Sequence, residues 1–107
     1  MIYKQAEIQH WAENRGIYNY GSFVAQAKVL AEEVVETTEA FAWYKAENTA
    51  QSIKDLHKEL GDIYVTWINA CYMADIRPEA AIDTAVKVNS ERTGNMINGR
   101  FVKDTKD

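Results

Sequence analysis

Helix-breaking residues occupy few positions in this chain of 107 residues, and their positions limit the fold more than any other feature does. The five glycines and the single proline are Gly16, Gly21, Gly61, Pro78, Gly94 and Gly99. Only Gly61 interrupts a long stretch in which apolar residues recur three or four positions apart, as they do along one face of a helix. The spacing of the breakers therefore predicts four helices and no strand-rich region.

The four expected helices cover, in order, roughly residues 2–14, 22–46, 49–75 and 78–90. Ser22 is expected to cap the second helix, and Asn48 with Gln51 resembles a capping box before the third. Pro78 suits the first turn of the fourth helix, where its missing N–H has no intrahelical partner to lose.

The segments outside these helices are short. Residues 18–22 are expected to form a connecting loop. The tail from about residue 93 is polar and contains two glycines, so we expect it to be irregular or a short hairpin. We predict one all-α domain over residues 1–107, resembling a four-helix bundle with a short irregular C-terminal tail.

Apolar residues cover two sides of the helix expected over residues 22–46. One side carries Ala25, Val29, Ala40 and Trp43, and the other carries Phe23, Val24, Leu30, Val34 and Phe41. A chain of this size buries only about two thirds of its unfolded surface, and one small bundle has few elements with which to cover both sides. We therefore predict a homo-oligomer, either a dimer or a tetramer.

Acidic residues form a pattern on the second and third expected helices. They are Glu32, Glu33 and Glu36, followed by Glu59 and Asp62. At about 100° per residue, the first three share one sector of their helix with apolar residues, and the other two border the apolar sector of theirs. Like charges in a partly dry site repel one another, so they take up protons or bind a cation. The pattern favours a divalent metal site, and a solvated, salt-bridged surface is the alternative.

Composition narrows the classes of function. A net charge of −4 argues against stable nucleic-acid binding, which requires clustered Lys and Arg. The longest uncharged run, residues 63–74, has 12 residues, whereas a membrane span needs about 20. The first residues do not show the pattern of a secretory signal, so we expect none, and the lone Cys71 cannot form an intramolecular disulfide. We therefore expect a cytoplasmic protein without a membrane segment.

The acidic residues also match a family motif. The segment Glu32-Glu33-Val34-Val35-Glu36 is followed, after 22 residues, by Glu59-Leu60-Gly61-Asp62. This pattern resembles the EExxE and ExxD motifs of the MazG-like all-α nucleoside triphosphate pyrophosphohydrolases. Residues 87–94 are similar to the basic C-terminal helix of that family, so the resemblance covers about residues 22–94.

This resemblance implies an activity and a set of site residues. Members of the family use Mg²⁺ to cleave a nucleotide between its α and β phosphates, and they release a monophosphate and pyrophosphate. By similarity, the metal ligands are Glu33, Glu36, Glu59 and Asp62. Glu32 belongs to the same catalytic group, and it either orients a ligand or accepts a proton from the attacking water. Oxygen ligands suit Mg²⁺, with Mn²⁺ as the alternative, better than Zn²⁺.

Three polar residues near the end of the fourth helix are expected to bind the nucleoside triphosphate. Lys87 and Arg92 carry charges that suit phosphates, and Asn89 lies three residues before Arg92 on the same side of the helix. Alternatively, the cations only complement the helix dipole. Two rival functions stay open, namely a phosphoribosyl-ATP pyrophosphohydrolase of the same fold and a non-catalytic helical interaction module.

Overall fold

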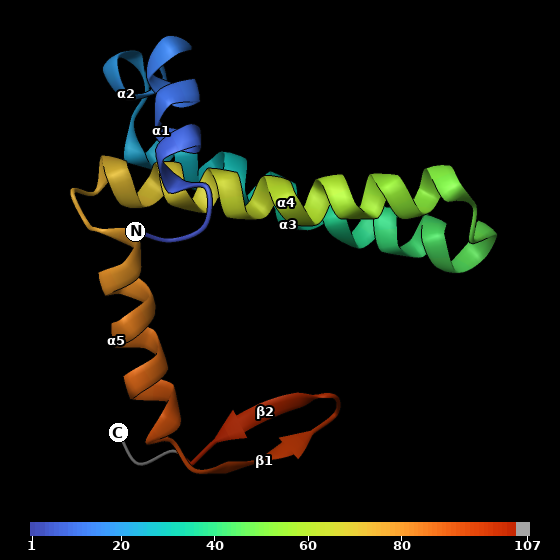
Figure 1. Cartoon of the computed structure of the whole chain (residues 1–107). Coiled ribbons are helices and arrows are strands. Elements are labelled where there is room, and N and C mark those ends of the chain that lie inside the picture. The colour runs from blue at the N-terminus through green and yellow to red at the C-terminus, as the bar shows by residue number, and fades with distance from the viewer. Residues whose placement is uncertain (105–107) are drawn as a thin grey trace.

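The computed structural model describes residues 1–104, and it is mostly helical, which confirms the all-α prediction (Figure 1). The elements of this part of the chain are α1 (Gln5–Asn14), α2 (Ile17–Tyr20), α3 (Phe23–Glu47), α4 (Ala50–Met73), α5 (Pro78–Ser90), β1 (Gly94–Ile97) and β2 (Arg100–Lys103). Each of the four expected helices is present. The fifth, α2, is a single turn that the sequence did not predict.

The two long helices α3 and α4 run antiparallel and form the main body of the molecule (Figure 1). As expected, Ser22 caps α3, because its hydroxyl accepts a hydrogen bond of 3.1 Å from a backbone N–H of the first turn. The capping box of α4 consists of Thr49 and Ser52. The prediction of Asn48 with Gln51 was wrong by one position, because Asn48 ends α3 in the left-handed conformation, with φ of 47°.

The N-terminal helices pack against one end of this pair. α1 contacts α4 and buries Ile8 and Ala12. Most of the loop expected over residues 18–22 is the helical turn α2, whose Tyr18 hydroxyl donates a hydrogen bond of 2.7 Å to Asn69 Oδ1 on α4. This bond joins residues far apart in the sequence, so the short helix is fixed to the main body.

The helix α5 leads away from the α3/α4 pair, so the bundle is only partly formed (Figure 1). Two apolar residues of α5, Ile82 and Val88, are 38% and 45% exposed. The radius of gyration is 16.6 Å, whereas a compact chain of this length has one of about 13 Å. The bundle arrangement is therefore only partly shown, because α3 and α4 pair and α1 contacts α4, whereas α5 leads away from them in the single chain.

The tail forms the antiparallel hairpin, which was one of the two forms that the sequence left open. Gly94 pairs with Lys103, and the turn residues Asn98 and Gly99 have φ of 51° and 82°. Two successive positive φ angles are typical of the type I′ turn, which matches the twist of a two-stranded hairpin.

A large apolar surface stays uncovered in the single chain. The accessible surface is 8053 Å², whereas a compact monomer of this mass exposes about 6,100 Å². The predicted second side of α3 contributes four of the exposed residues, namely Phe23, Val24, Val34 and Phe41. None of the helices described in residues 1–104 is long and apolar enough to cross a membrane.

Candidate metal site between α3 and α4

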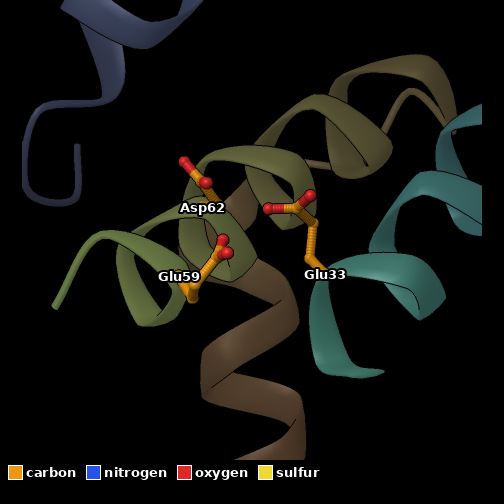
Figure 2. Close-up of side chains that lie close together, drawn as sticks. All are labelled: Glu33, Glu59 and Asp62. Atoms are coloured by element: carbon orange, nitrogen blue, oxygen red, sulfur yellow. The ribbon is translucent and has the colours of Figure 1, made fainter. Parts of the chain in front are cut away.

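Three of the five predicted acidic residues lie close together between α3 and α4 (Figure 2). Glu33 extends from α3 toward Glu59 and Asp62 of α4, and one carboxylate oxygen of each lies within 4.8 Å of the others. Around Mg²⁺, with oxygen ligands at about 2.1 Å, adjacent oxygens are about 3 Å apart and opposite ones about 4.2 Å. Small side-chain movements therefore suffice to place the three oxygens around one ion.

The most buried of these acids has an unsatisfied oxygen. Glu59 is only 9% exposed, and among the described residues its Oε1 has no hydrogen-bond partner. The Nζ atom of Lys58 is 3.5 Å away, which is too long for a good hydrogen bond. A buried carboxylate oxygen without a partner loses solvation free energy, and a bound cation removes that loss. The geometry and chemistry of the three acids thus fit a divalent ion.

The acids also perturb one another. Burial raises the pKa of Glu33, and a hydrogen bond with Asp62 raises it further. The negative charges of three neighbouring acids act in the same direction, namely Asp62, Glu36 and Glu59. The metal-free cluster therefore holds a proton more readily than a solvated Glu does, and a metal ion competes with that proton.

Lys58 is a residue of this site that the sequence prediction missed. Its Nζ lies 2.9 Å from Asp62 Oδ2 and is also drawn toward Glu59. The hydrogen bond to Asp62, together with the charges of both acids, raises the pKa of the Lys58 ammonium. The signal was present in the sequence, because a Lys four residues before an Asp meets it on one face of a helix. The acid cluster thus already attracts one cation.

The other two predicted acids lie outside the group of close oxygens. Glu36 is one turn along α3 from Glu33 and is exposed, although its charge acts on Glu33. Glu32 is also exposed and, with Glu36, borders a shallow apolar hollow beside Ala31 and Val35. The roles of Glu32 and Glu36 stay predictions.

Two of the three predicted substrate-binding residues, Lys87 and Asn89, lie in the last turn of α5, and Arg92 follows the end of that helix by two residues. Arg92 Nη1 donates a hydrogen bond of 2.7 Å to Asn89 Oδ1, and Lys87 is exposed nearby on the same helix. Because α5 leads away from α3 and α4, one chain does not bring these residues to the acid cluster (Figure 1). Their role in binding phosphates is also still a prediction.

A cleft adjoins the acid cluster on the side of α1 and α2. Its volume is about 380 Å³, within the range of small-molecule sites. Glu33 and Asp62 line one part of it, and the rest includes Trp11, Gln26 and Asn69. The arrangement can therefore hold a cation beside a space large enough for an organic ligand.

No protein-family model matches this chain, and neither a curated protein nor a solved structure matches it. The resemblance to the MazG-like enzymes is therefore a prediction that depends on the motifs in the sequence.

Proposed function

We propose that this protein is a Mg²⁺-dependent nucleoside triphosphate pyrophosphohydrolase that produces a nucleoside monophosphate and pyrophosphate. The observation that supports this proposal most strongly is the convergence of Glu33, Glu59 and Asp62 beside a cleft. Hydrolysis of a triphosphate requires compensation of its negative charge, and acidic side chains provide it through a bound divalent ion.

The proposed ligands are these three carboxylates, with Glu36 as the predicted fourth, and Mn²⁺ is the alternative ion. The bound ion would offset phosphate charge and polarise the phosphoryl group under attack. One water is consumed, and the anhydride bond between the α and β phosphates is broken. The proton of the attacking water would pass to a nearby carboxylate, for which the candidate is Glu32, the exposed residue that precedes Glu33 on α3. The alternative role of Glu32 is to orient a ligand.

Lys58 has a place in the same proposal. Its ammonium is paired with Asp62, yet its side chain is 65% exposed and is free to turn outward on a long flexible stem. Once a divalent ion binds the acids in place of Lys58, the ammonium is available to pair with a phosphate of the substrate.

We also propose that the protein works as a homo-oligomer, a dimer or a tetramer, in the cytoplasm, where nucleoside triphosphates are found. The support is the accessible surface, which exceeds that of a compact monomer by about 2,000 Å². An interface of standard size buries about 800 Å² per subunit, so the excess is enough for at least one. The residues predicted to bind phosphates are Lys87, Asn89 and Arg92. In such an assembly they can do so only if α5 of one subunit lies beside the acid cluster of a neighbouring subunit.

The test is a panel of ribo- and deoxyribonucleoside triphosphates together with phosphoribosyl-ATP, incubated with and without Mg²⁺ and assayed for pyrophosphate. We expect Mg²⁺-dependent release from at least one of them, and loss of that activity in Glu59→Gln. Glu39→Gln, an exposed site on α3, is the control for the change in charge. Preferential cleavage of phosphoribosyl-ATP would favour that rival enzyme, and no cleavage of any substrate would favour the non-catalytic module.

A further inference from the structure

The cleft beside the acid cluster has two chemically different ends. Gln26 lies seven positions before Glu33 on α3, and Asn69 lies seven positions after Asp62 on α4. Each step is about 10 Å along its helix. Because α3 and α4 are antiparallel, both steps lead toward the same end of the cleft, and all four residues line it. Two carboxylates therefore lie at one end and two carboxamides at the other.

Asn69 is a buried polar group that faces this cleft. It is only 2% exposed, and its Oδ1 accepts a hydrogen bond of 2.7 Å from the Tyr18 hydroxyl. Among residues 1–104, Glu59 Oε1 is the one buried polar side-chain atom without a hydrogen-bond partner, so the Asn69 amide group carries no unmet desolvation cost. Because Asn69 lines the cleft, its Nδ2 is a donor that it can offer to a water or to an acceptor atom of a ligand.

Tyr18 fixes the orientation of that amide. Its ring stacks on Tyr72, with ring centroids 4.7 Å apart. Burial, together with the neighbouring Tyr72 and Glu13, raises the pKa of Tyr18 to about 12, further above neutral pH than the ordinary value of 10. Because the hydroxyl donates to Oδ1, Nδ2 is left as the donor toward the cleft.

The wall of the cleft also offers an aromatic surface. Trp11 is 42% exposed, and the Arg15 guanidinium lies 5.2 Å from the centroid of its ring. An indole that is only partly covered suits stacking against a flat ligand. Trp11 is therefore an aromatic lining residue of the cleft that is open to a ligand.

We propose that the end of the cleft formed by Gln26 and Asn69 binds the nucleobase of the substrate. Asn69 donates to a carbonyl oxygen or ring nitrogen of the base, Gln26 contacts the base edge, and Trp11 stacks on the ring. Tyr18 is a positioning residue that acts through Asn69. This inference rests on the proposed function, because it places the phosphates at the acids about 10 Å away.

The first test does not depend on catalysis. Free uridine, cytidine, adenosine and guanosine are titrated without metal, and the side-chain amide signals of Asn69 and Gln26 are followed by NMR. We expect at least one nucleoside to shift both signals, and Tyr18→Phe to weaken that nucleoside's binding by about tenfold. If none of the nucleosides shifts either signal, the subsite is overturned, whether or not triphosphates are hydrolysed.

The second test measures selectivity among the triphosphates. In Asn69→Ala, Gln26→Met and Tyr18→Phe, we expect the ratio of kcat/KM between the best and worst bases to fall about tenfold, with Mg²⁺ affinity unchanged. Gln26→Met keeps the side-chain volume and serves if Asn69→Ala does not fold. Asn19→Ala, an exposed site on α2, is the matched control.

The two tests separate the two proposals. Unchanged base selectivity in all three subsite variants of an active enzyme would overturn the subsite and leave the hydrolase proposal intact. Shifts of the amide signals in a protein that hydrolyses no triphosphate would support the subsite and overturn the hydrolase proposal.

Discussion

Replacing Glu33 by Gln removes one negative charge from the acid cluster and keeps nearly the same side-chain volume. In the metal-free protein the Glu33 carboxylate repels those of Glu59 and Asp62. Two unit charges 4.8 Å apart repel by about 0.9 kcal/mol at the dielectric constant of water, and by about 3.5 kcal/mol at an effective value of 20. Because Glu33 is half-buried and Lys58 partly neutralises Asp62, we expect the relief to be about 1 kcal/mol.

The variant should therefore be more stable than the wild type without metal, with a melting temperature about 4–8 °C higher for a chain of this size. Mg²⁺ should reverse the order. At ten times its Kd, the ion stabilises the wild type by about 1.4 kcal/mol, whereas Glu33→Gln lacks a ligand and gains little. The two stability curves should cross as Mg²⁺ is added.

Thermal unfolding followed by circular dichroism, in EDTA and in increasing Mg²⁺, measures both effects. Glu39→Gln changes the same charge at an exposed position of α3, and it should behave as the wild type does at every Mg²⁺ concentration. The reasoning is refuted if Glu33→Gln melts below the wild type in EDTA, or if Mg²⁺ stabilises both proteins equally.

Four further predictions follow from the same cluster and from the exposed apolar surface. Since the pKa of Glu33 is raised in the folded state, the contribution of Glu33 to metal-free stability should be greatest below the ordinary Glu pKa of about 4.3 and should decline as the pH rises through the raised value. Urea unfolding in EDTA between pH 5 and 7 checks this, and a profile equal to that of Glu33→Gln would contradict it. In Lys58→Gln the ammonium no longer competes with Mg²⁺ for Asp62, so calorimetry should show Mg²⁺ binding that is about two- to fivefold tighter. Weaker binding would show that Lys58 does not compete. Asp62→Asn and Glu36→Gln should each abolish turnover with unchanged helicity, and full activity in both would exclude the proposed site. Light scattering should give a dimer or tetramer that Phe41→Glu dissociates, and a monomeric wild type would rule out the assembly.

Local sequence signals predicted most of the helices. Ser22 and Pro78 mark the starts of α3 and α5 as expected, because capping and the missing N–H of proline act within a single turn. The capping box of α4 lies one position later than we predicted. Asn48 ends α3 in the left-handed conformation, so Thr49 is the N-cap residue of α4. The direction of α5 could not be predicted from the sequence, because an apolar stripe on α5 does not specify whether its own chain or another subunit covers it.

The candidate site was predicted in part for a similar reason. Helical periodicity placed Glu33, Glu59 and Asp62 beside the apolar sectors that bring α3 and α4 together, and the structure unites them. Periodicity alone does not describe a contact between helices. The amide pair of Gln26 and Asn69 was therefore missed, because it depends on the register of the antiparallel helices and on the position of α2.

The central claim is that the acids between α3 and α4 support cleavage between the α and β phosphates. The most direct measurement is ³¹P NMR of a nucleoside triphosphate incubated with the protein and Mg²⁺. We predict equal amounts of nucleoside monophosphate and pyrophosphate, with no orthophosphate, and no reaction in EDTA or with Glu59→Gln. Release of orthophosphate, or undiminished reaction with Glu59→Gln, would contradict the account.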